Sequence, residues 1–189
     1  MTRATVNGAR PGLALAAVNA MDEDAFVAAL GDLFEHSPWV ARAAFDRRPF
    51  ATVADLHGAL EAAVRAAPRA RQVELVRAHP ELAGRVARTG ELTEASTSEQ
   101  ARAGLDRLTA DELRSLEELN ASYRERFGFP MVICVREHTK DSILAWARAR
   151  LGHTREDEIA TALGEIAKIA DLRLRDLVFE DSGSSEGAA

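Results

Sequence analysis

Cysteine is almost absent from this sequence of 189 residues: Cys134 is the only one, so no disulfide forms within the chain and oxidising export is not implied. Long apolar runs are missing too, and the existing ones fall far short of the roughly 20 residues that cross a bilayer. Positive charge is not in excess. The formal net charge of −6 argues against a nucleic-acid footprint and against attraction to anionic lipid. These absences favour a cytoplasmic protein with no nucleic-acid or membrane partner.

Motifs that bind metals and cofactors are also missing. The five histidines are scattered, and the sequence contains neither a His-Glu-x-x-His pattern nor a cluster of cysteines. Phosphate-binding loops and the glycine fingerprint of dinucleotide sites are absent. We therefore expect neither a metal nor an organic cofactor.

The composition is that of a globular domain, with 47% apolar and 29% charged residues. The length favours one domain with a sizeable core. We expect residues 1–18 to form a loosely ordered leader and residues 19–179 to form the folded domain. Residues 180–189 are rich in serine, glycine and acid, and we expect a disordered tail there.

Apolar residues recur at helical spacing through most of the chain, as at Phe26, Leu30, Leu33 and Phe34. Helix starts are predicted where a small polar residue precedes a proline or precedes an acidic residue by three positions. These starts are Ser37-Pro38, Thr52 with Asp55, Ser96 with Glu99, Thr109 with Glu112, and Thr154 with Asp157. The predicted fold is an all-α, single-domain bundle of about eight helices.

One run, Phe129 to Val135, looks like a strand but has no second strand candidate to pair with. We interpret it as a buried extended segment. Its backbone groups need hydrogen-bond partners, and a ligand is one possible partner. Cys134 lies within this apolar run, which favours an inert buried thiol over a nucleophile.

Two short runs contain side chains of the types that active sites use. His79-Pro80 places an imidazole at a helix end, because proline disfavours helical geometry in the residue before it. Ser96 to Gln100 supplies hydroxyls, a carboxylate and an amide. Structural interpretations stay open for both, since a histidine is favoured at a helix C-terminus and Ser96 with Glu99 is itself a capping box. Arg173 either points its charge into a partly buried site or extends past the core to solvent.

Runs along most of the chain together resemble one enzyme family. They include Phe34 to Ala41, Arg48-Pro49-Phe50, His79 to Arg85, Leu92-Thr93, Ser96 to Gln100, Ala103-Gly104-Leu105, Leu119-Asn120 with Tyr123, Phe127 to Val135, and Leu172 to Leu174 with Asp176 to Val178. In this order and spacing they resemble the 2-oxo-4-hydroxy-4-carboxy-5-ureidoimidazoline (OHCU) decarboxylase family of uric acid degradation.

The resemblance implies a role for each matching residue. His79 matches the catalytic histidine, Pro80 a substrate contact and Arg173 an arginine that approaches the substrate from the last helix. The segment that binds substrate matches Ser96, Thr97, Ser98, Glu99 and Gln100, of which Glu99 is also catalytic. A stretch whose backbone touches the ligand matches Met131, Val132, Ile133, Cys134 and Val135; the family often has phenylalanine at the position of Met131. The family is all-helical, cofactor-free and commonly homodimeric.

The implied activity is decarboxylation of OHCU to (S)-allantoin. Two other functions stay open from the sequence. One is a related decarboxylase or lyase that acts on another ureido or hydroxy acid. The other is a helical interaction module without catalytic activity, although such a module has no need to keep histidine, glutamate and arginine together.

Overall fold

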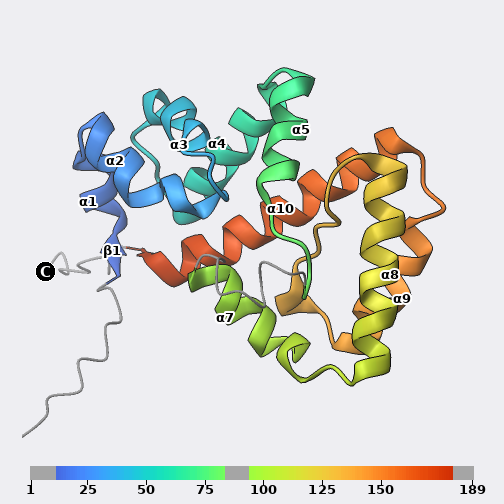
Figure 1. Ribbon diagram of the computed structural model, residues 1–189. Coiled ribbons are helices and arrows are strands. Elements are labelled where there is room, and N and C mark those ends of the chain that lie inside the picture. Colours follow the sequence, from blue (N-terminus) through green and yellow to red (C-terminus); the bar gives the residue numbers. More distant parts are fainter. Residues whose placement is uncertain (1–11, 84–93, 181–189) are drawn as a thin grey trace, which may run out of the picture.

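Helices dominate the computed structural model, which describes residues 12–83 and 94–180 (Figure 1). Within those ranges the helices are α1 (Leu15–Ala20), α2 (Glu23–Leu30), α3 (Trp39–Ala44), α4 (Val53–Ala66), α5 (Arg69–Ala78), α7 (Glu94–Arg102), α8 (Ala110–Phe127), α9 (Lys140–Arg150) and α10 (Arg155–Leu177). Short 3-10 helices are η1 (Gly31–Leu33), η2 (Phe45–Arg47), η3 (Leu105–Arg107) and η4 (Val135–Glu137). The predicted all-α fold is confirmed.

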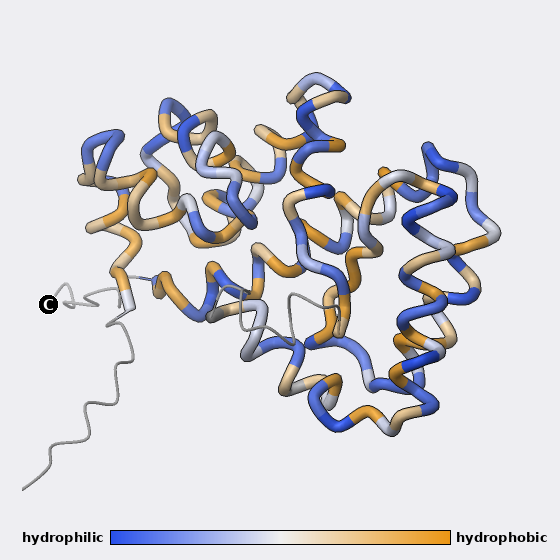
Figure 2. Tube along the Cα trace, in the orientation of Figure 1, coloured by the Kyte–Doolittle hydropathy of each residue, from blue (hydrophilic) through white to orange (hydrophobic). Residues whose placement is uncertain are grey.

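The longest helix, α10, runs across the molecule between the N-terminal helices and the group formed by α7, α8 and α9 (Figure 1). Its start is fixed by Thr154, whose side chain accepts a hydrogen bond from the backbone N–H of Asp157, as predicted. The buried residues of α10 recur three and four positions apart along one broad face of the helix, and α10 contacts α4, α5 and α8. Hydrophobic and hydrophilic positions alternate along the helices (Figure 2). Because α10 reaches both groups, it joins them into one core.

Local capping patterns predicted most helix starts correctly. Thr52 with Asp55 and Thr109 with Glu112 form complete capping boxes, in which each side chain accepts a hydrogen bond from the other residue's backbone N–H. The start predicted at Ser37-Pro38 is shifted by one residue, since α3 begins at Trp39 with Pro38 as its N-cap. The start predicted at Ser96 is wrong, because α7 already begins at Glu94 and Ser96 lies inside it.

The predicted leader is partly wrong. Residues Leu13–Ala14 form strand β1, which pairs in parallel with β2 (Val178–Phe179), so the described residues 12–18 belong to the fold. Leu15 and Val18 are only 3% and 0% exposed, and burial of these two side chains anchors the segment. Residues 1–11 and 181–189, the rest of the predicted leader and nearly all of the predicted tail, lie outside the described residues. Glu180, the first residue of the predicted tail, accepts a hydrogen bond from the backbone N–H of Val53 at 2.8 Å.

The predicted extended segment, Phe129 to Val135, is buried and forms no strand; it is extended up to Cys134, whereas Val135 already begins η4. It follows α8, which ends at Gly128 in the left-handed conformation (φ 79°) that glycine adopts without steric penalty. The segment then leads into η4. Among the helices of residues 12–83 and 94–180, none is long and apolar enough to cross a membrane.

Candidate active site

His79 lies at the end of α5 with an extended backbone (φ −76°, ψ 140°), as Pro80 requires. Its Nδ1 is 2.9 Å from the backbone carbonyl oxygen of Leu75. A carbonyl only accepts hydrogen bonds, so Nδ1 carries the proton and donates it. The other ring nitrogen, Nε2, then presents a lone pair. Nε2 is buried and has no hydrogen-bond partner in the part of the chain that the structure describes.

Burial also sets the charge of this imidazole. The His79 side chain is almost completely enclosed, and loss of hydration lowers its pKa from 6.5 to about 4. The hydrogen bond to Leu75 and the charge of Glu35 act in the opposite direction but are outweighed. His79 is therefore neutral at pH 7, and its free Nε2 is able to accept a proton.

Arg173 of α10 is 8% exposed and gathers side chains from distant parts of the chain. Its Nε and Nη2 donate to the two carboxylate oxygens of Glu99 at 2.9 and 2.8 Å. Nη2 also lies 3.0 Å from a carboxylate oxygen of Glu35 and 3.1 Å from the hydroxyl of Ser96. The Ser96 hydroxyl in turn donates to Glu35. Two carboxylates thus share one guanidinium in a buried cluster.

The electrostatics of the cluster keep Glu35 and Arg173 charged. Burial by itself would raise the pKa of Glu35, but the hydrogen bond from Ser96 and the charge of Arg173 outweigh it and lower that pKa. Burial likewise opposes the charge of Arg173, yet the hydrogen bonds and charges of Glu99 and Glu35 raise its pKa. With His79 neutral, the two carboxylates and one guanidinium leave one net negative charge.

The turn after His79 is held by side chains from two other helices. Gln100 of α7 accepts a hydrogen bond from the backbone N–H of Ala83 at 2.9 Å. Asn120 of α8 donates to the carbonyl of Leu82, also at 2.9 Å. Ala83 has a φ of 47°, a left-handed conformation that is unfavourable for a residue with a Cβ. These two hydrogen bonds hold the turn in that conformation and so fix the direction of the chain beside His79.

The structure brings most of the predicted site residues around one cavity of about 30 Å³. The cavity is lined by His79, Pro80, Leu82, Ser96, Glu99, Gln100, Met131, Val132, Ile133, Val135, Ile169 and Arg173. That volume is enough for about two water molecules. Three predicted residues do not line it: Thr97 and Ser98 are exposed on α7, and Cys134 is buried between two lining residues without lining the cavity itself.

Sequence reasoning missed Glu35, which binds Arg173 and Ser96 but was not assigned a role. Glu35 lies in the run Phe34 to Ala41 that contributed to the family resemblance, which was the available signal. Leu82 and Ile169 line the cavity with apolar side chains and were missed as well. In residues 12–83 and 94–180, no group of three or more His, Cys, Asp or Glu side chains is arranged to hold a metal ion.

Comparison with known proteins identifies the family that this chain matches and several similar proteins. The profile of the OHCU decarboxylase family matches residues 19–175. A 2-oxo-4-hydroxy-4-carboxy-5-ureidoimidazoline decarboxylase of Haloferax volcanii is 46% identical over 162 residues, covering 86% of this chain and 94% of that protein. The protein of the same name from Mus musculus is 42% identical over 168 residues, covering 89% of this chain and 94% of that protein. The crystal structure of an (S)-allantoin synthase superposes with a TM-score of 0.71 at 29% identity; the match covers 88% of this chain and 54% of that one, about half its length.

Proposed function

Because this chain belongs to the OHCU decarboxylase family, we propose that it is a carboxy-lyase that converts OHCU to (S)-allantoin and carbon dioxide without a cofactor. The observation that carries the proposal is the geometry of His79. A neutral imidazole with one ring nitrogen fixed by Leu75 offers its other nitrogen, which has no hydrogen-bond partner among the described residues, at a cavity that Glu99 and Arg173 also line.

The chemistry of the substrate explains why no cofactor is needed. Its C4 carries both a carboxylate and a hydroxyl, and the neighbouring C5 is joined to a ring nitrogen by a double bond. When the bond from C4 to the carboxylate breaks, the electron pair moves toward C5 and that nitrogen, so the ring itself accepts the charge. Two protons must then be placed. The ring nitrogen takes the one proton that is consumed, from solvent, for each carbon dioxide released, and the proton that leaves the C4 hydroxyl ends on C5, which it must reach from one face to give a single enantiomer.

We assign the proton transfers to His79. Nε2 accepts the proton of the C4 hydroxyl, which becomes the carbonyl of the product, and the imidazolium then donates a proton to C5. The lowered pKa supports this order, because only a neutral histidine accepts a proton and a weakly basic one gives it back readily. The hydrogen bond from Nδ1 to Leu75 keeps Nε2 pointing in one direction and so supports protonation from one face.

We assign to Arg173 the task of holding Glu99 and Glu35 in place and of keeping Glu35 charged. Its Nε and Nη2 are already bonded to these carboxylates and to Ser96, so a substrate carboxylate at those atoms would add negative charge to a cluster that already carries one net negative charge. The backbone N–H groups of Met131 and Ile133 suit the substrate carboxylate better. Both residues line the cavity, and neither N–H has a hydrogen-bond partner within residues 12–83 and 94–180.

The same family membership supports a proposal about the oligomeric state and location of the enzyme. We propose a homodimer that works in the cytoplasm, supported by the resemblance to the OHCU decarboxylase family. Size-exclusion chromatography with light scattering measures the dimer directly. A monomer at micromolar concentration would contradict this part of the proposal.

The test of the activity generates OHCU in situ from urate with urate oxidase and hydroxyisourate hydrolase, and follows (S)-allantoin by circular dichroism. We expect rapid growth of the signal with this protein and a His79→Gln variant slower by about 100-fold or more, the usual contribution of a general acid–base group. Glutamine keeps a donor for the carbonyl of Leu75 but has no basic nitrogen. His57→Gln is the matched control, because His57 also bonds a helix carbonyl, that of Ala167, away from the cavity. Racemic product formed at the spontaneous rate by folded protein would refute the proposal.

A further inference from the structure

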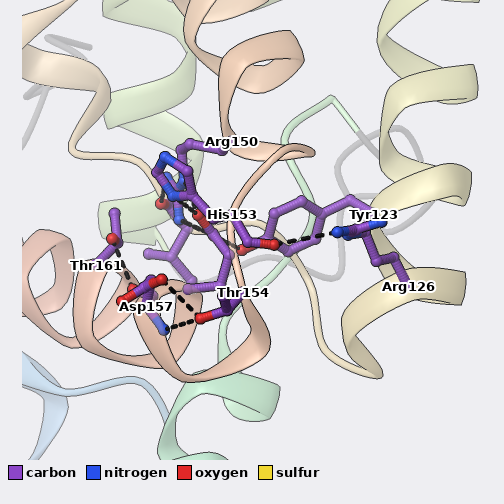
Figure 3. Close-up of polar contacts among 9 residues, drawn as sticks. Tyr123, Arg126, Arg150, His153, Thr154, Asp157 and Thr161 are labelled. Atoms are coloured by element: carbon purple, nitrogen blue, oxygen red, sulfur yellow. Dashed lines mark hydrogen bonds and ion pairs between the residues drawn. The ribbon is translucent and has the colours of Figure 1, made fainter.

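A second buried polar group lies next to the active site but contributes no side chain to the cavity. It consists of Arg150 on α9, Glu158 on α10 and Tyr123 on α8, which are 2%, 0% and 0% exposed. Arg150 donates from Nε and Nη2 to one oxygen of Glu158 at 3.1 and 2.9 Å, and the hydroxyl of Tyr123 donates to the same oxygen. His153 approaches the other oxygen of Glu158 at 2.6 Å (Figure 3).

Stability alone does not explain a charged pair in this position. Removing an arginine and a carboxylate from water is costly, and apolar residues of similar volume often give a protein at least as stable. Burial raises the pKa of Tyr123, so its hydroxyl stays protonated and serves as a donor to Glu158. Glu158 is thus surrounded by donors that hold it in one place, and it holds the guanidinium of Arg150.

The remaining nitrogen of Arg150 reaches the active-site wall. Nη1 donates to the backbone carbonyl of Val132 at 2.7 Å, within the extended segment that lines the cavity. Two residues further along, the backbone N–H of Cys134 donates to a carboxylate oxygen of Glu165 at 2.7 Å. Ile133 therefore lies between two anchors, one from α9 and one from α10. These side chains replace the neighbouring strand that an extended segment otherwise pairs with.

We propose that Arg150 is a positioning residue for the reaction: through the carbonyl of Val132 it fixes the backbone of residues 131–133, so that the N–H groups of Met131 and Ile133 face the substrate. This inference rests on the proposed function, because those N–H groups are taken there as the contacts of the substrate carboxylate. It assigns the Arg150–Glu158 pair a task in substrate binding, carried out from behind the cavity wall.

The test compares two variants that disturb the same buried group differently. The double variant Arg150→Met/Glu158→Gln removes both charges together, so no charge is left buried alone, and it removes the donor to Val132. Glutamine still offers an acceptor to the hydroxyl of Tyr123. The control, Tyr123→Phe, deletes a hydrogen bond to Glu158 but leaves the bond from Arg150 to Val132. Each protein is assayed for kcat and KM with OHCU generated in situ, and the backbone amide resonance of Ile133 is recorded by NMR.

We expect kcat/KM of the double variant to fall by about 100-fold, with a higher KM and a shifted Ile133 amide resonance, because small displacements in a site have effects of that size. Tyr123→Phe should keep the KM and the Ile133 resonance of the wild type, even if it melts earlier. A merely structural role would lower kcat with the folded fraction and leave KM and the resonance unchanged, and that result would overturn the proposal. An inactive wild-type protein would instead refute the proposed function, and the Ile133 resonance would still decide whether Arg150 fixes the segment.

Discussion

Replacing Arg173 by glutamine tests whether one guanidinium compensates two buried carboxylates. Glu35 and Glu99 are 3% and 8% exposed, and Arg173 donates to both. Removing one partner of a buried ion pair lowers the free energy of unfolding by about 3–5 kcal/mol, because a charge stays buried without compensation. The free energy of unfolding of a whole domain is about 5–15 kcal/mol, so we expect Arg173→Gln to fold but to be much less stable than the wild type.

The pH dependence of this loss is the sharper test. In the wild type the pKa of Glu35 is lowered below its usual 4.5, so its contribution to stability is present above that pH and is lost as the pH falls. In the variant, burial and the neighbouring carboxylate should raise the pKa of a carboxyl group above 4.5. The contribution of that carboxyl group to the free energy of unfolding is then present at low pH and is lost as the pH rises through the raised pKa. The difference between the two proteins should therefore be larger at pH 8 than at pH 5.

Urea unfolding followed by circular dichroism measures both effects. A loss of about 4 kcal/mol corresponds to a midpoint lower by about 2 M urea at pH 8, given typical slopes for small proteins. Arg175→Gln is the matched control on the same helix, because Arg175 pairs with Asp171 at the surface and its side chain is 62% exposed. That variant should unfold at the urea concentration of the wild type. An equal loss at pH 5 and pH 8 for Arg173→Gln would refute the idea that two carboxylates are left charged and buried.

Two further outcomes are expected. The kcat/KM of the wild type should stay level between pH 6 and 8 and should fall as the pH drops toward about 4, because protonation of His79 removes the lone pair of Nε2. A pH–rate profile with a midpoint near 6.5 would contradict the argument that burial lowers the pKa of His79. Cys134 should resist alkylation by iodoacetamide in the native protein, since burial raises its pKa to about 11. Cys134→Ala should keep full activity, because Glu165 binds the backbone N–H of this residue rather than its thiol. Rapid alkylation, or loss of turnover in a folded variant, would assign the thiol a role that the structure does not give it.

Features set by neighbours in the sequence were predictable. The helix starts at Thr52, Thr109 and Thr154 depend on a hydroxyl and a backbone N–H three residues apart, so the pattern is complete within one turn. The end of α5 at His79 follows from a steric clash with Pro80, which is again local. The position of His79 at a helix end was therefore predictable, whereas the partner of its Nδ1 and the burial that lowers its pKa came from the structure.

Ser96 shows why local patterns are not sufficient at the site. Ser96 with Glu99 has the spacing of a capping box, yet α7 begins at Glu94 and both side chains point to Arg173, which lies 77 and 74 residues further along the chain. The hydroxyl of Ser96 also donates to Glu35, 61 residues earlier. A charge-assisted hydrogen bond inside a buried cluster is stronger than a neutral cap at a helix end, so the distant partners determine where these side chains point. No pattern within a few residues of Glu35 indicates this partnership. For the same reason Arg150, which acts through the carbonyl of Val132, is not distinguishable in the sequence from the surface arginine Arg148 on the same helix.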